Sequence, residues 1–375
     1  MTNSYIFHKN VVQLGGRLPR ELLPTELAKE YYRVLDNNAK TLISSAQEIL
    51  PQLPPIHFDF VLSGEINACA FKADNRYFIG VTTGTLFMLD LVLLRMLSDP
   101  RLFDFALDSS LEATDLPNLV DYAPHADRMY NSGQLPIRPK STQREDYARH
   151  LFDHAFLFLV GHELAHITRG HVDYYDDKVG LTMIDEMGWV PFDSEKMLER
   201  QSIEADADRR STFSRIASIE LQHLNHSKEI PAWANSVESP KKLLFDWTLA
   251  VNILFRLFGD IRFSPKQLLH EFYPPLPLRR MMVSGATLAC ASSWDAITED
   301  DSAFAVRTAV KYCEYAFATI LGENPSMEGV RNANSLECRE HNRLLVKFWY
   351  ETMRDRIVKH SYEPDLIGAN EGLKE

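Results

Sequence analysis

Residues 162–166 read His-Glu-Leu-Ala-His, the pattern of side chains that a catalytic zinc ion requires. Positions four apart lie on the same face of a helix, so His162 and His166 can bind one metal ion together. Glu163 is rotated by about 100° from His162 and points beside the ion, where a carboxylate can take a proton from water. The pentapeptide therefore predicts a metal site with a general base next to it.

The residues around this motif predict a long buried helix. The stretch that starts near Thr142 contains no proline before Gly170 and is dense in Leu, Phe and Val ahead of His162. Thr142 and Glu145 have the spacing of a capping box, and Gly170 is typical of a helix end. The alternative is a core helix whose histidines are satisfied by hydrogen bonds. For the complete pentapeptide we favour metal binding.

A zinc site of this type requires a third protein ligand and leaves the fourth position to water. His171 is a poor candidate, because in a continuing helix it would point about 140° away from His166. Glu204 and Asp208 are four residues apart in a predicted helix and share one face, from which Asp206 is turned away. We expect Glu204 to bind the metal and Asp208 to accept a hydrogen bond from a ligand histidine. The alternative is an acidic, solvated helix face.

These residues carry a family resemblance. The HExxH motif at 162–166, followed by Glu-x-x-Ala-Asp at 204–208, resembles the gluzincin metallopeptidases of the HtpX and CAAX prenyl endopeptidase type. Three further segments are similar to that family in the same order: Asn-Ala-Cys-Ala at 67–70, a strand and turn at 77–86, and Pro-Pro-Leu-Pro-Leu-Arg at 274–279. The Lit-type phage-exclusion peptidases are another zincin group to which the chain is similar, through HExxH alone.

The resemblance implies one Zn²⁺ ion per chain and a set of site residues. The metal ligands would be His162, His166 and Glu204, with Glu163 as the general base and Asp208 behind the ligands. It also suggests Tyr273 or Arg279 as a donor to the oxyanion, and a substrate-binding edge strand that includes Asn67 and Ala68 or the strand 77–81.

The chain departs from this family in three respects. Residues 87–143 separate the turn from the metal helix, where the family has a short connection, so we expect an inserted lid or subdomain. Tyr273 stands where the family has a histidine. No stretch is apolar enough for the membrane-spanning helices that are frequent in the family, and we expect no stable membrane insertion.

Composition limits the class of protein. With 375 residues and 45% hydrophobic content the chain can bury a substantial core. Its N-terminus lacks the layout of a signal peptide, and its four cysteines show no CxxC spacing, so we expect a soluble, cytoplasmic protein. A net charge of −12 argues against nucleic-acid partners. The expected partner is a protein or peptide substrate.

The expected fold class is α+β, predominantly helical, with a zincin-like architecture and a small β-sheet. Strands are predicted at 58–62 and 77–81, and helices at 20–50, 86–97, 241–258, 302–321 and 335–359. The predicted units are an N-terminal helical segment at 1–57, a peptidase domain at 58–285 with an insertion at about 99–140, a C-terminal helical region at 286–360 and a solvated tail at 361–375.

The sequence thus predicts a zinc-dependent endopeptidase in which Glu163 is the general base for a metal-activated water. The alternative is a non-catalytic zinc-binding protein, with a regulatory or defence-related interaction role, on a zincin scaffold. The intact Glu163 speaks against this alternative, because a structural metal site has no need of a base.

Overall fold

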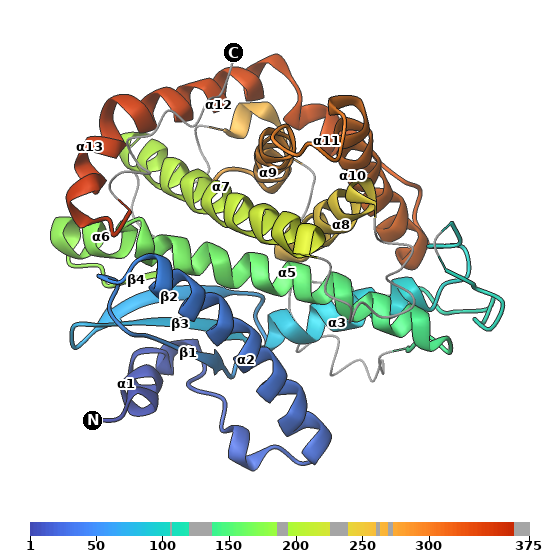
Figure 1. Ribbon diagram of the computed structural model, residues 1–375, viewed down its shortest axis with the longest axis horizontal. Coiled ribbons are helices and arrows are strands. Elements are labelled where there is room, and N and C mark those ends of the chain that lie inside the picture. Colours follow the sequence, from blue (N-terminus) through green and yellow to red (C-terminus); the bar gives the residue numbers. More distant parts are fainter. Residues whose placement is uncertain are drawn as a thin grey trace.

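The computed structural model describes residues 1–105, 107–119, 137–185, 194–225, 239–259, 263–268 and 273–363. The chain is mostly helical with one small mixed sheet, which confirms the predicted α+β, predominantly helical class (Figure 1). None of the helices in these ranges is long and apolar enough to cross a membrane. The helices are α1 (Asn3–Asn10), α2 (Glu26–Ile49), α3 (Thr83–Leu97), α5 (Thr142–Thr168), α6 (His171–Val179), α7 (Ser194–Asn225), α8 (Pro240–Phe258), α9 (Leu276–Ala291), α10 (Glu299–Leu321), α11 (Glu328–Ala333), α12 (Leu336–Phe348), the π-helix η5 (Trp349–Met353) and α13 (Arg354–Ile357).

The sheet has four strands in the order β1-β3-β2-β4. The strands are β1 (Ile56–Val61), β2 (Ala68–Ala73), β3 (Arg76–Thr82) and β4 (Met183–Asp185). β1 runs parallel to β3, whereas β2 is antiparallel to both β3 and β4. The two predicted strands are confirmed as β1 and β3. The prediction that 77–81 forms a sheet edge is wrong, because β3 lies between β1 and β2.

A tight hairpin joins β2 to β3. Ala73 pairs with Arg76, which leaves only Asp74 and Asn75 in the loop, and both have positive φ, at 50° and 57°. Two-residue loops of this conformation match the right-handed twist of the strands, and Asp and Asn tolerate it better than most residues. Local turn chemistry therefore sets the register of the hairpin.

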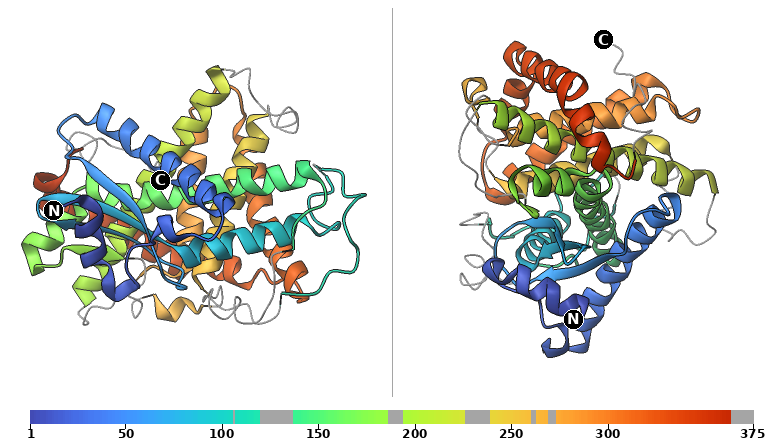
Figure 2. Two further views of the ribbon diagram at one scale, coloured as in Figure 1. Left: turned by 90° about the horizontal axis from the view of Figure 1, so that it is seen from below. Right: turned by 90° about the vertical axis from the view of Figure 1, so that its left-hand side faces the viewer.

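Side chains alternate between two apolar layers along the sheet. Phe58 and Ile79 face the main core beneath α5, while Phe71 and Phe78 face a smaller cluster beneath α1 that includes Phe7. Figures 1 and 2 show α1 on the side of the sheet away from α5. This two-residue period is what a strand buried on both faces requires.

Helix α5 is the central element, with α7 and α8 above it and the sheet and α3 below it in Figure 1. Its buried residues occupy most of its circumference, as the apolar segment predicted. Ser141 is the N-cap, one residue before the predicted cap. Gly170 ends the helix, as predicted, with φ of 79°, and a Cβ there would lie 2.5 Å from the backbone of His360. The chain therefore turns at Gly170 and starts α6.

The described part of the predicted insertion is anchored far from the motif. Phe103 is fully buried, and Arg144 near the start of α5 donates hydrogen bonds to backbone carbonyls of residues 97–102. Arg144 precedes His162 by eighteen residues, roughly 27 Å along a helix axis. In Figure 1 this segment, in teal, lies at the opposite end of α5 from α6. Residues 120–136 of the candidate lid lie outside the described residues.

Candidate metal centre

Three predicted ligands meet between α5 and α7. The side chains of His162, His166 and Glu204 place one possible ligand atom each within 4.8 Å of one another. The Nε2 atoms of the two histidines are 3.0 Å apart. Glu204 Oε2 lies 3.4 Å from His162 Nε2, and its Oε1 lies 3.6 Å from His166 Nε2. All three side chains are at most 1% exposed.

These distances fit a shared metal ion. Bonds of about 2.0 to 2.1 Å in a tetrahedral site put neighbouring ligand atoms roughly 3.3 Å apart. The separations of 3.0 to 3.6 Å bracket that value. Within the residues that the structure describes, neither buried oxygen of Glu204 accepts a hydrogen bond of regular geometry. Arg200 and Arg279 also lie near these oxygens, at 3.0 and 3.7 Å, and the spacing of the three side chains would allow the group to hold a metal ion as well.

His162 is held from behind by a carboxylate, as predicted. Its Nδ1 lies 2.9 Å from Asp208 Oδ1, and Arg279 on α9 donates to both oxygens of Asp208 at 2.8 Å. Burial alone would raise the pKa of Asp208, but Arg279 and His162 outweigh burial and lower it. The ionised carboxylate fixes the proton of His162 on Nδ1, which leaves the Nε2 lone pair for a metal.

His166 is held by a second, longer relay that sequence reasoning missed. Its Nδ1 lies 3.0 Å from Nδ1 of His171, whose Nε2 lies 3.3 Å from Asp206 Oδ2. Arg169 binds both oxygens of Asp206 at 2.7 and 2.8 Å. Burial lowers the pKa of His166 and of His171, which favours their neutral forms. With the His166 proton on Nδ1 and the His171 proton on Nε2, each donor has an acceptor and Nε2 of His166 faces the metal position.

The turn at Gly170 explains why His171 lies between His166 and Asp206. Asp206 is indeed turned away from Glu204 and Asp208, but toward His171 rather than toward solvent. A continuing helix would have carried His171 away from His166. The turn at Gly170 brings it back, so the signal in the sequence was the glycine between the two histidines.

Arg200 links Glu204 to Tyr273. Its Nη2 lies 3.0 Å from Glu204 Oε1 and donates to the hydroxyl of Tyr273 at 2.8 Å. Arg279 Nη2 is 3.7 Å from the other oxygen of Glu204. Burial would raise the pKa of Glu204, but Arg200 and the histidines lower it well below its ordinary value. Of the two predicted oxyanion donors, Arg279 thus lies 3.7 Å from Glu204, and Tyr273 is connected to Glu204 through Arg200.

Glu163 is 1% exposed and follows His162 directly on α5, while the metal-binding group is completed by Glu204 from another helix. The site therefore has one carboxylate within the possible metal-binding group and a second carboxylate on the residue that follows His162.

The predicted substrate residues lie at the start of β2. The amide of Asn67 donates to the hydroxyls of Thr82 and Thr85, at 3.1 and 2.9 Å, and Ala68 pairs with β3. On its other side β2 is paired with β4 at residues 69–71. An added strand at this edge would therefore have to replace β4 or bind before it.

In comparisons with protein-family models, with curated proteins and with solved structures, nothing matches this chain.

Proposed function

We propose that the chain is a zinc-dependent endopeptidase. The observation that carries the proposal is the convergence of two imidazoles and one carboxylate on a single point, with Glu163 next to His162 on the same helix. Two imidazoles and one carboxylate form the donor set of a catalytic zinc site with an open fourth position. The resemblance to the HtpX and CAAX prenyl endopeptidase type supports the same reaction.

Zinc, when bound, supplies Lewis-acid chemistry, since it polarises a peptide carbonyl and acidifies water. Glu163 then accepts a proton as the water oxygen bonds to the carbonyl carbon. The same carboxyl group gives that proton to the leaving amine nitrogen as the carbon–nitrogen bond breaks.

The two candidate oxyanion donors, Arg279 and Tyr273, differ in their hydrogen-bond partners. Arg279 donates from Nε and Nη2 to the two oxygens of Asp208, which favours a positioning role through His162. Tyr273 accepts a hydrogen bond from Arg200, a cation that makes its hydroxyl a better donor. We therefore assign the oxyanion contact to Tyr273.

The first prediction tests the base. Glu163→Gln should keep about one zinc per chain and abolish hydrolysis of an unstructured peptide mixture, because it removes the base and leaves every ligand in place. Glu145→Gln, the same change at the first turn of α5, is the matched control and should leave both unchanged. Metal content and newly formed N-termini are the measurements. Cleavage that survives in Glu163→Gln would place the base elsewhere.

A non-catalytic zinc protein is the second candidate, and one observation favours it. The ligands and Glu163 are all at most 1% exposed, so no substrate reaches them without movement. In that case the wild type would bind zinc and cleave nothing, and Glu163→Gln would behave like the wild type in every assay.

A further inference from the structure

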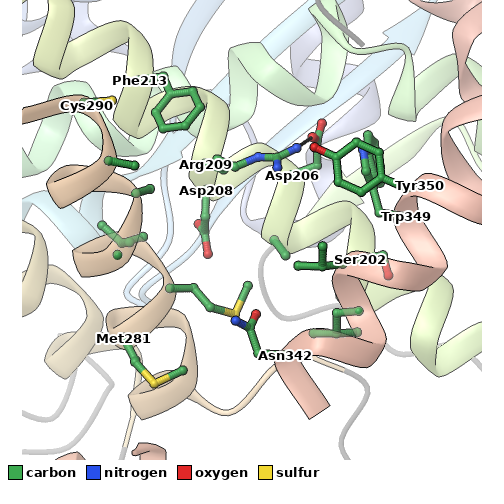
Figure 3. Close-up of a pocket in the computed structure, with 18 of the residues that line it drawn as sticks. Ser202, Asp206, Asp208, Arg209, Phe213, Met281, Cys290, Asn342, Trp349 and Tyr350 are labelled. Atoms are coloured by element: carbon green, nitrogen blue, oxygen red, sulfur yellow. Dashed lines mark hydrogen bonds and ion pairs between the residues drawn. The ribbon is translucent and has the colours of Figure 1, made fainter. Parts of the chain in front are cut away.

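A cavity of about 590 Å³ lies on the other side of α7 from the metal centre. Its walls come from α7, α9, α12 and the π-helix η5. Figure 3 shows Trp349 and Tyr350 beside Asp206 and Arg209 on one side, and Met281 on α9 across from them. Glu204 is not among its lining residues, so it is distinct from the space between the ligands.

Three features mark this cavity as a binding site rather than a packing defect. Its volume lies within the range of small-molecule pockets, and its lining is mainly aromatic and aliphatic. A Cβ built on Gly285, on the α9 wall, would meet nothing within 4 Å, so the α9 wall is open at this point. Trp349 and Tyr350 come from a π-helical turn, a costly geometry that occurs frequently at functional sites.

The two carboxylates in the lining are already compensated. Asp208 receives two hydrogen bonds from Arg279, and Asp206 receives two from Arg169. Neither arginine lines the cavity. A ligand therefore does not need to bring a cation to satisfy these groups.

The remaining charged groups in the lining are cations. Arg209 approaches Asp206 at 3.0 Å as its second arginine, and Arg339 is exposed on α12. The lining thus holds two arginines beside two carboxylates, and each carboxylate is also bonded to an arginine outside the lining. An apolar space with cations in its wall is complementary to a molecule with an apolar body and one acidic group.

We propose that this cavity binds a small amphipathic monoanion of the acyl carboxylate type. The apolar chain would lie along α9 over Gly285, between Met281 and the aromatic pair Trp349 and Tyr350. The carboxylate would be paired with Arg209 and Arg339. The proposal concerns binding and does not depend on peptidase activity.

The test is calorimetric titration of the full-length protein with dodecanoate, below its micellar concentration. We expect saturable binding of one molecule per chain. Gly285→Leu should weaken it by about tenfold or more, because the new side chain occupies the space of the ligand. Gly285→Ala is the matched control, since it also removes the helix glycine but adds one carbon, and should change the affinity by no more than about threefold. Thermal unfolding should show that both variants fold.

A second variant tests the charge. Arg339→Met should weaken dodecanoate binding by about threefold to tenfold, whereas Arg343→Met, an exposed arginine on the same helix outside the lining, should not. Dodecyltrimethylammonium, with the same chain and the opposite charge, should bind much more weakly. The proposal is overturned if dodecanoate does not bind the wild type, if Gly285→Leu binds it equally well, or if the cationic probe binds as tightly.

Discussion

At the scale of residues, the two histidines of the candidate metal centre are oriented by contacts of unequal length. His162 contacts Asp208 directly, whereas His166 contacts His171, which in turn contacts Asp206. Each carboxylate is in turn held by an arginine on both oxygens. Removing a group that orients a ligand histidine lowers metal affinity by roughly 10 to 100-fold.

The second prediction follows from this relay. His171→Ala should lower zinc affinity by roughly 10 to 100-fold, similar to Asp208→Ala, because each leaves one ligand imidazole without its acceptor. His171→Gln should lose less, since its amide can accept from His166 and donate to Asp206. Competition with a chromogenic chelator measures the affinities. Wild-type affinity in His171→Ala would show that the relay does not support the ligand.

The residues of the ligand group could be predicted because their signal is local. His162 and His166 are four apart on one helix, and so are Glu204 and Asp208, so spacing alone places each pair on a face. The role of His171 could not be predicted in this way. It depends on a change of direction at Gly170, and helix periodicity does not extend across a break.

At the scale of elements, the junction between α5 and α6 determines where His171 lies. Gly170 has φ of 79°, and a Cβ there would lie 2.5 Å from the carbonyl of His360 and 2.7 Å from the amide nitrogen of Ser361. The residues after α13 close over this point, and the amide of Tyr362 donates to the carbonyl of Thr168. Gly170 is therefore required for two reasons: its backbone is left-handed, and the space around its Cβ position is filled.

The third prediction separates these two contributions. Gly180 has a similar φ of 66° but open space around its Cβ position, which makes it the matched control. Gly180→Ala should cost about 1 kcal/mol of unfolding free energy, for the left-handed backbone alone. Gly170→Ala should cost roughly 3 kcal/mol or more, because backbone atoms must also move. Urea unfolding measures both. Equal losses would mean that the C-terminal residues give way freely.

The fourth prediction concerns β4, which occupies the edge of β2. The amide of Lys72 donates to the carbonyl of Thr182, so by antiparallel alternation the amide of Ile184 faces β2 and that of Met183 faces outward. Ile184→Pro should therefore loosen β4, while Met183→Pro should not. If β4 limits access, Ile184→Pro should speed hydrogen exchange at the amides of Ala70 and Lys72, which face β4, and raise cleavage of an unstructured peptide several-fold.

This prediction rests on the proposed endopeptidase activity. Its outcomes distinguish a failure of the blocking role of β4 from a failure of the peptidase proposal. Faster exchange with unchanged cleavage would show that β4 does not block the site. No cleavage by any variant would instead argue against the peptidase.

β4 itself could not be predicted, since three residues are too few to show a period of two, and its pairing with β2 spans more than a hundred residues of sequence.

At the scale of the whole molecule, segments predicted as separate units contribute to one core. Leu35 from α2, Ile79 from the sheet and Phe317 from α10 belong to the same buried cluster as Phe156 of the metal helix. Sequence patterns predicted most of the long helices and two strands, because amphipathic periods are local, but they did not predict α1, α6, α9 or α11. Which helices would enclose a cavity behind α7 was not predictable, since that depends on packing between elements far apart in sequence.

The last prediction connects the two sites across α7. Asp206 and Asp208 line the cavity and also contact His171 and His162, so the cavity and the candidate metal centre share these two carboxylates. Attraction between a bound carboxylate and a divalent ion should strengthen each by several-fold, on the order of 1 kcal/mol. Linkage requires that the two factors be equal. Dodecanoate should therefore bind zinc-loaded protein more tightly than chelator-treated protein, and zinc affinity should rise by the same factor with dodecanoate present.

Gly285→Leu should remove the effect of dodecanoate on zinc affinity while leaving zinc binding itself intact. Equal dodecanoate affinities with and without zinc would show that α7 separates the two sites energetically as well as spatially.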